Sequence, residues 1–271
     1  MRYEKYSGCG NDFIIVNNMD KKLSVDEVVP TIPYLCRRGM SIGADGFIML
    51  EPSDEADFLW HFRNADGSVA EMCGNGARCA ARFAFLHGIA GERLTIKTIA
   101  GIITAEIKTP PDVKVLLTPP KDMRLNEEYP LTDKYTVFSY INTGVPHTVF
   151  ILDGNEDIEA LDIVRWGRIV RFHPRFGAAG TNVNFIKKLD DDLLRIRTYE
   201  RGVEGETLAC GTGCAAAAVI ANSIGLVKSP VKLLTSSGKI LAVYLEDNGI
   251  YMQGEARRLS EGEILPEAGK Y

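Results

Sequence analysis

Two short segments of the sequence share one pattern, and this repetition constrains the fold more than any other feature. Residues 73–81 and 210–218 both read C-G-x-G-x-x-x-A-A. In each segment a cysteine precedes a glycine-containing turn and an alanine-rich stretch that favours helix. Backbone N–H groups and the helix dipole favour negative charge at a helix N-terminus, so we expect lowered thiol pKa values at Cys73 and Cys210.

The repetition extends well beyond the cysteines. The two segments lie 210 − 73 = 137 residues apart, and the same shift places Gly43 on Gly180. Each half then contains alternating apolar strands around its cysteine motif, and a glycine turn beside an apolar strand precedes both halves, at 10–16 and 144–150. The strands expected are 47–50, 58–62, 94–97 and 102–107 in the first half, and 185–186, 194–199, 231–234, 240–245 and 251–252 in the second.

This duplication predicts two α/β domains of like build, related by a pseudo-two-fold. One helix of each domain would carry its cysteine motif to a cleft, where a binding site is the default expectation. Residues 118–134 are rich in proline and charge and are expected to form the crossing between the domains.

Composition excludes several classes of protein. The net charge of −5 argues against a nucleic-acid-binding surface. Six cysteines in 271 residues are too few for a disulfide scaffold, so we expect reduced thiols and a cytoplasmic protein. Residues 1–6 lack the apolar core of a signal peptide, and the apolar stretch 209–227, interrupted by polar residues and glycine, predicts a buried helix rather than a membrane span.

Paired thiols allow few chemistries. The spacings C-x5-C and C-x3-C do not match zinc sites, C-x-x-C redox pairs are absent from the sequence, and neither segment is a phosphate-binding loop. Two-base proton transfer remains, in which one thiolate removes a proton from carbon and the opposite thiol returns one to the other face. Cys36, Cys79 and Cys214 are expected to be buried apolar residues, and the role of Cys9 stays open.

The helix N-termini can also hold a carboxylate. Negative charge grows on that group as an α-proton leaves, so backbone N–H groups would stabilise the transition state more than the bound substrate. Side chains in place of the glycines would block this approach. An α-amino acid is therefore the expected small-molecule substrate.

The chain resembles the diaminopimelate epimerases, amino-acid epimerases of lysine biosynthesis that use no cofactor or metal. Six segments carry the resemblance. They are 10–13, 64–68, 73–79, 181–185, 199–202 and 210–213. The two cysteine motifs alone would also fit the related proline racemases, and the Asn-Ala-Asp-Gly segment at 64–67 and the Glu-Arg-Gly segment at 200–202 make the diaminopimelate epimerases the closer match.

The resemblance implies a mixed α/β fold in which each domain wraps a β-sheet or barrel around a central helix, with the active site in the cleft. It also favours a homodimer and interconversion of LL- and meso-diaminopimelate. On this fold we assign residues 1–118, completed by 260–271, to the first domain and 119–259 to the second.

The resemblance further implies roles for individual residues. Cys73 and Cys210 would be the two acid–bases. Gly74, Asn75, Gly211 and Thr212 would hold the reacting α-carboxylate, and contacts further out would come from Asn11, Asn64, Asn182, Glu200 and Arg201. An Arg fork can bind the distal carboxylate, and a carboxylate can accept from the distal ammonium group.

Some alternatives stay open. Glu200 and Arg201 could form a solvated surface pair, Asn64 and Asn182 could be turn residues, and His147 could line the site or be structural. Val145 and Gly46 depart from residues common in the family, which puts distal recognition in doubt. The runner-up function is a proline, hydroxyproline or histidine racemase of the same architecture, and a rival of another class is a non-catalytic thiol switch or metal-binding protein.

Overall fold

The computed structural model describes residues 1–70 and 72–270 and divides into two compact units. Unit 1 consists of Met1–Leu116 and the chain from Gly254 onward, and unit 2 consists of Leu117–Gln253. The second crossing lies earlier than the 259/260 boundary that we assigned, because the strand formed by residues 257–263 pairs with the first strand of the chain.

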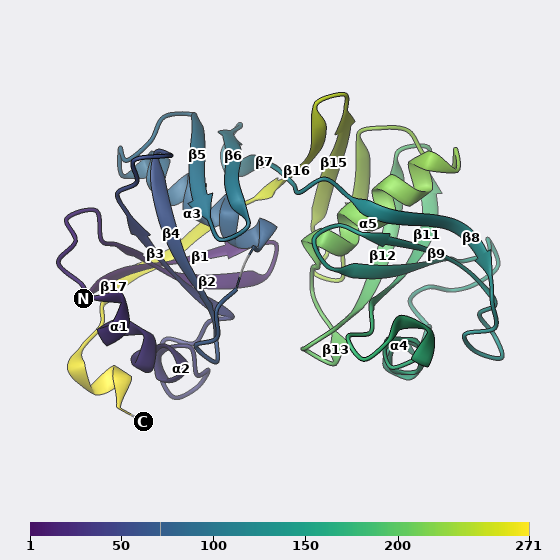
Figure 1. Ribbon diagram of the computed structural model, residues 1–271, viewed down its shortest axis with the longest axis horizontal. Coiled ribbons are helices and arrows are strands. Elements are labelled where there is room, and N and C mark those ends of the chain that lie inside the picture. Colours follow the sequence, from purple (N-terminus) through teal and green to yellow (C-terminus); the bar gives the residue numbers. More distant parts are fainter. Residues whose placement is uncertain (71, 271) are drawn as a thin grey trace. The chain divides into compact units, whose positions relative to one another are not determined.

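Unit 1 contains a curved sheet in the order β17-β1-β2-β3-β4-β5-β6-β7 (Figure 1). The pairs β2–β3 and β4–β5 are parallel, and the other neighbours are antiparallel. Its strands are β1 (Arg2–Gly8), β2 (Asn11–Asn17), β3 (Gly46–Glu51), β4 (Phe58–Asn64), β5 (Arg93–Thr98), β6 (Gly101–Ile107), β7 (Asp112–Leu116) and β17 (Arg257–Glu263).

Unit 2 repeats this topology strand for strand. Its order is β8-β9-β10-β11-β12-β14-β15-β16, with β10–β11 and β12–β14 parallel and the other neighbours antiparallel. The strands are β8 (Lys121–Glu128), β9 (Val137–Asn142), β10 (Pro146–Ile151), β11 (Asn182–Asp190), β12 (Leu193–Glu200), β14 (Val231–Leu234), β15 (Ile240–Glu246) and β16 (Gly249–Glu255), and a short β13 (Gly205–Glu206) pairs with β12.

Helices lie in the connections between parallel strands, which cannot be joined by tight turns. Each unit therefore has two helical crossovers at matching places in its topology. They contain α1 (Val25–Val28), η1 (Val29–Thr31), α2 (Ile32–Leu35) and α3 (Gly74–Leu86) in unit 1, and α4 (Ile163–Arg171), η2 (Pro174–Phe176) and α5 (Gly211–Ser223) in unit 2; η3 (Pro266–Gly269) follows β17.

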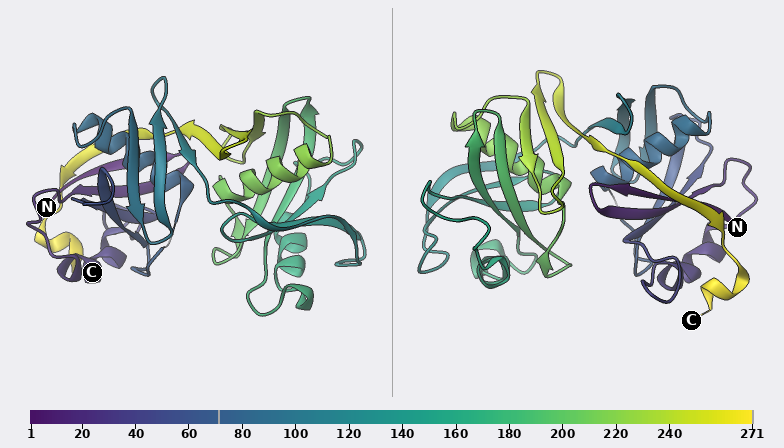
Figure 2. Two further views of the ribbon diagram at one scale, coloured as in Figure 1. Left: turned by 45° about the horizontal axis from the view of Figure 1, so that its top comes forward. Right: turned by 180° about the vertical axis from the view of Figure 1, so that it is seen from behind.

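In each unit the strands curve around one long helix, α3 or α5 (Figure 2). Most residues of both helices are buried, and alanine and glycine keep them thin enough to be surrounded by strands. Within the described residues, no helix combines the length and the apolar character needed to cross a membrane.

The strands predicted from alternation are confirmed, and so are the two helices predicted from the alanine-rich stretches. The crossing predicted at 118–134 is wrong, because residues 121–128 form β8, which pairs with β9. Nearly all of β8 is exposed, so its charged composition resembles that of a linker. Charged side chains on an edge strand also discourage pairing with another chain.

Candidate functional site

Both helix N-termini place a cysteine at the N-cap position. Cys73 precedes α3 and Cys210 precedes α5, each with extended backbone. The Cys73 Sγ accepts a hydrogen bond from the Gly76 N–H at 3.4 Å. The cysteine side chain therefore satisfies one of the backbone donors that have no partner within the helix in its first turn. The predicted placement of both cysteines at helix starts is therefore confirmed.

The third helical residue of each motif is a glycine, Gly76 in α3 and Gly213 in α5, and the space available for a side chain differs between the two. A Cβ added at Gly213 would lie 2.5 Å from Asn184 Oδ1, whereas one added at Gly76 would meet its nearest neighbour, Ile48 Cδ1, at 3.3 Å. Gly213 is therefore required by the close approach of a buried polar side chain.

An amide cluster surrounds Cys73. Asn11 Oδ1 lies 3.6 Å from the Cys73 Sγ and accepts a hydrogen bond from Asn75 Nδ2 at 3.2 Å. Asn11 Nδ2 in turn donates to Asp45 Oδ2 at 2.9 Å. The structure thus brings three of the predicted residues of unit 1 together, and it adds Asp45, which we did not predict as a site residue.

Burial dominates the surroundings of Cys210. Its side chain is 7% exposed, and its Sγ lies 3.5 Å from Thr212 Oγ1. Burial raises the pKa of the Cys210 thiol well above its usual value, and the negative charge of Glu200 raises it further; hydrogen bonds from Thr212 and the Gly213 N–H lower it by less. The lowered pKa predicted for Cys210 is therefore wrong, because desolvation outweighs the helix terminus.

The unit 2 residues predicted to contact the distal end of the substrate are held by hydrogen bonds. Asn182 Oδ1 accepts from the Arg201 backbone N–H at 2.8 Å, and Asn182 Nδ2 donates to the Pro146 carbonyl at 3.0 Å. Thr207 Oγ1 donates to Glu200 Oε2 at 2.8 Å. These bonds fix the end of β12, from which Glu200 and Arg201 project.

Asn64 has a different environment. It is exposed at the end of β4, and its Nδ2 donates to Ser68 Oγ at 3.0 Å within a turn. Its hydrogen bonding is that of a turn residue.

His147 is fully buried in unit 2. Its Nδ1 lies 3.1 Å from Asn184 Nδ2, and its Nε2 has no hydrogen-bond partner among the described residues. Burial lowers the pKa of His147 to about 3, and the charge of Arg201 lowers it further, so the ring is neutral at physiological pH.

Asn184 connects His147 to the Cys210 helix, and sequence analysis did not select it. Its Nδ2 also donates to the Thr148 carbonyl at 3.0 Å, and its Oδ1 accepts from Thr198 Oγ1 at 3.0 Å. A signal was present in the sequence, since Asn182 and Asn184 lie on the same face of the first half of β11, where the neighbouring Val183, Phe185 and Ile186 are apolar.

The other cysteines are packed as expected. Cys36, Cys79 and Cys214 are buried, Cys9 is buried as well, and none of the six cysteines forms a disulfide. In the described part of the chain, no three His, Cys, Asp or Glu side chains are grouped closely enough to hold a metal ion.

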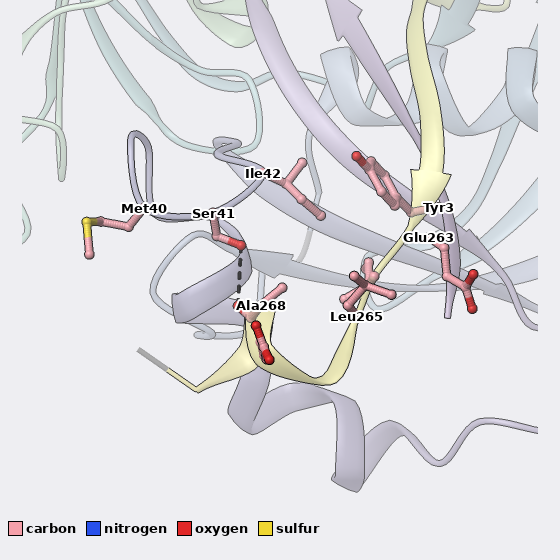
Figure 3. Close-up of a pocket in the computed structure, with 9 residues that line it drawn as sticks. Tyr3, Met40, Ser41, Ile42, Glu263, Leu265 and Ala268 are labelled. Carbon is pink, nitrogen blue, oxygen red and sulfur yellow. Dashed lines mark hydrogen bonds between the residues drawn. The ribbon is translucent and has the colours of Figure 1, made fainter.

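A surface groove of about 440 Å³ lies elsewhere in unit 1 (Figure 3). It is formed where the chain after β17 passes β1 and the loop at 40–42, and Ser41 Oγ donates to the Ala268 carbonyl at 3.3 Å there. The residues predicted for the site do not line this groove.

Comparison with known proteins decides the family. The diaminopimelate epimerase family model matches residues 3–122 and 139–259. The chain belongs to the diaminopimelate epimerase family. It is therefore an enzyme, an epimerase within the isomerases, and the matched segments contain every residue predicted for the site.

Full-length relatives support the same assignment. The diaminopimelate epimerase of Aquifex aeolicus is 42% identical over 288 residues, with 100% of each chain covered. That of Hydrogenobaculum sp. is 45% identical over 281 residues, covering 98% of this chain and 99% of the relative.

A solved structure shows how widely the fold is used. A hydroxyproline epimerase from Agrobacterium vitis, with bound trans-4-OH-L-proline, has a TM-score of 0.70 and 15% identity, covering 100% of this chain and 95% of that chain. At this identity the similarity shows the two-domain fold of diaminopimelate epimerases and says nothing of the substrate.

Proposed function

We propose that the enzyme interconverts LL- and meso-diaminopimelate through two thiols, Cys73 and Cys210, which act on one α-carbon from opposite faces. The observation that carries this proposal is the strand-for-strand repeat, in which each unit places one cysteine at the N-cap of its central helix.

The proposed chemistry exchanges one proton for another. A thiolate takes the α-proton, which leaves an electron pair on the α-carbon and its carboxylate, and the opposite thiol then gives its proton to the other face. The carbon inverts, and the thiols exchange protonation states. The reverse reaction uses the same groups in opposite roles, so neither cofactor nor metal is needed for the balance.

Backbone donors would stabilise the carbanion-like intermediate. The backbone N–H groups of Gly74–Asn75 and Gly211–Thr212 belong to the first turns of α3 and α5, where an α-carboxylate would gain charge as the proton leaves. At the other end of the substrate, the Arg201 guanidinium would bind the distal carboxylate and Glu200 the distal ammonium. Asn11 and Asn182 would contribute amide contacts, and Asn64 remains a candidate contact.

The wider context belongs to the same proposal. We infer that the reaction serves lysine biosynthesis, that the enzyme is cytoplasmic and that it is a homodimer. The substrate would be the only small molecule required, and nucleic acid and membrane are not expected partners.

The decisive experiment follows deuterium. The enzyme is incubated in D2O with diaminopimelate, proline, hydroxyproline and histidine, and α-deuterium uptake is measured. Uptake with diaminopimelate alone supports the proposal. Uptake with one of the other amino acids, and none with diaminopimelate, would favour the runner-up racemase.

Substitution tests the thiols separately. Cys73→Ala and Cys210→Ala should each abolish epimerisation, because either change removes one of two acid–bases. Cys214→Ala is the matched control, since this buried thiol lies one turn further along α5. Retained epimerisation in both single variants would refute the two-thiol mechanism and leave room for a thiol with a switching role.

A further inference from the structure

A buried arginine lies directly behind the Cys73 motif. Arg78 is in the second turn of α3 and is fully buried. Its Nη2 donates to Asn75 Oδ1 at 2.8 Å and approaches Cys9 Sγ at 3.7 Å, and its Nη1 donates to the Gly74 carbonyl at 3.4 Å. Its Nε has no hydrogen-bond partner among the described residues.

All three partners of the Arg78 guanidinium are neutral. Two are amide or carbonyl oxygens, and burial raises the pKa of Cys9, so the third is a thiol rather than a thiolate. A guanidinium held away from water without an anion is strongly disfavoured. Such a charge calls for a compensating negative charge, and none of these three contacts supplies one.

The duplicated half shows that the fold does not need this arginine. Under the 137-residue shift, Arg78 corresponds to Ala215 and Asn75 to Thr212. The helix α5 has the same 13-residue length as α3, and Ala215 is buried at the matching place. The same helix therefore forms and packs in unit 2 with alanine where unit 1 buries a cation.

Arg78 also determines how the amides around Cys73 are oriented. A guanidinium only donates, so Asn75 must turn its Oδ1 to Arg78 and its Nδ2 to Asn11. Asn11 then presents Oδ1 to Asn75 and to the Cys73 thiol, and its Nδ2 to Asp45, which only accepts. A donor-only group at one end and an acceptor-only group at the other leave one arrangement for both amides.

We propose that Arg78 is a positioning residue of the epimerisation, which keeps positive charge and a fixed Asn75 amide behind the α3 N-terminus for the negative charge that the reaction forms there. This inference rests on the proposed function, which places the reacting α-carboxylate at that terminus. The charge on this group increases as the α-proton leaves, so Arg78 stabilises the transition state more than the bound substrate.

Arg78→Met tests this role because it keeps side-chain length and removes charge and donors. We expect kcat to fall about 100-fold, as for the loss of a transition-state donor, while KM changes little. Arg78→Lys keeps the positive charge but lacks the planar guanidinium that binds at two points, and its kcat should be about tenfold higher than that of Arg78→Met. Arg82→Met is the matched control: Arg82 is one turn further along α3 and donates to the Ala256 carbonyl, and its kcat and KM should stay near wild type.

A second variant separates positioning from folding. Asn75→Asp gives Arg78 a carboxylate at the present 2.8 Å contact and removes the donor to Asn11. We expect a higher Tm, because the buried charge gains a partner, together with a lower kcat. If Arg78→Met does not fold, the kcat and Tm of Asn75→Asp still test whether Arg78 has a positioning role.

The outcomes are distinct. Wild-type kcat in Arg78→Met, or losses of kcat and Tm that occur together and are not recovered by Arg78→Lys, would overturn the inference, as would a lowered Tm in Asn75→Asp. A wild-type enzyme that exchanges no deuterium into diaminopimelate would contradict the proposed function instead.

Discussion

At Cys210 two influences on one thiol act in opposite directions. The helix terminus and the hydrogen bonds of Thr212 and Gly213 favour the thiolate, whereas burial and the charge of Glu200 favour the thiol. Burial is the larger influence, so the pKa of Cys210 is raised. A proton is therefore retained on Cys210 at neutral pH, which agrees with the proton-donor role that we propose for it.

Glu200→Gln should shift this balance. Removing the negative charge lowers the pKa of Cys210, so its reaction with iodoacetamide should begin at lower pH than in wild type, since the thiolate is the reactive form. Peptide mass spectrometry measures the rate at Cys210 across pH. Asp192→Asn, which removes an exposed acid paired with Lys232, is the control. An unchanged pH profile in Glu200→Gln would contradict the role assigned to Glu200.

The two equivalent motif glycines should respond differently to alanine. Gly213→Ala drives a Cβ against Asn184, which three hydrogen bonds hold in place, and should lower the free energy of unfolding by about 1–3 kcal/mol. Gly76→Ala brings its Cβ within 3.3 Å of Ile48 Cδ1, the end of a side chain that can shift slightly, so the gain in helix propensity of up to about 1 kcal/mol offsets the crowding. Urea denaturation measures both, and equal losses would contradict the packing described for Gly213.

Local sequence determines only part of this residue-scale picture. The glycine turn and the alanine run are contiguous with each cysteine, so the N-cap placement of Cys73 and Cys210 could be predicted. The pKa of Cys210 could not, because its burial and the position of the Glu200 charge arise only when the chain folds. The role of Asn184 as a packing partner of Gly213 was hidden for the same reason.

At the scale of the elements, ion pairs connect β2 to the segment that precedes β3. Asp12 on β2 forms ion pairs with Lys5 on β1 and with Arg38, and Arg38 also pairs with Asp45 at 2.8 Å. Burial alone would raise the pKa of Asp12, but hydrogen bonds from Arg38 and Lys5 hold it below its usual value. This network also holds Asp45, and with it Asn11, in place beside Cys73.

Arg38→Met should make unit 1 more sensitive to acid. A lowered pKa in the folded state contributes stability that is complete above the unfolded value of about 3.9 and is lost as the pH falls through the folded value. Without Arg38 the pKa of Asp12 rises, and acid unfolding followed by circular dichroism should begin at higher pH. Arg37→Met, a change at the exposed neighbouring arginine, is the control and should leave the midpoint unchanged.

Elements with one apolar face were predictable, and exposed ones were not. The strands β4, β12 and β15 alternate in sequence, and β3 is a continuous apolar run; all four were placed within a few residues. The strand β8 has almost no buried residue, so nothing in its pattern separated it from a linker. It forms because β9 offers backbone partners, which only the folded chain brings alongside it.

On the scale of the whole molecule, the enzyme is one topology used twice with different side chains. The repeat predicted this duplication, and the strand orders of both units match element for element. The halves differ even within the motifs that they share, where Arg78 and Asn75 of one half stand against Ala215 and Thr212 of the other. A symmetric scaffold therefore presents two chemically unlike helix termini.

Mild oxidation tests whether the two thiols can reach each other. If both act on one α-carbon, oxidation should join Cys73 to Cys210, abolish epimerisation and be reversed by a reductant. Peptide mapping identifies the bond, and Cys73→Ser should prevent it. Inactive oxidised enzyme in which both thiols are still free would contradict the shared site.

The pairing of β17 with β1 has a consequence for biosynthesis. The two strands that complete one edge of the unit 1 sheet are separated by the entire sequence of unit 2. A ribosome therefore releases all of unit 2 before unit 1 can acquire its last strand, whereas unit 2 is contiguous and can fold as it emerges. The half that is translated first is therefore the half that receives its last strand at the end of synthesis.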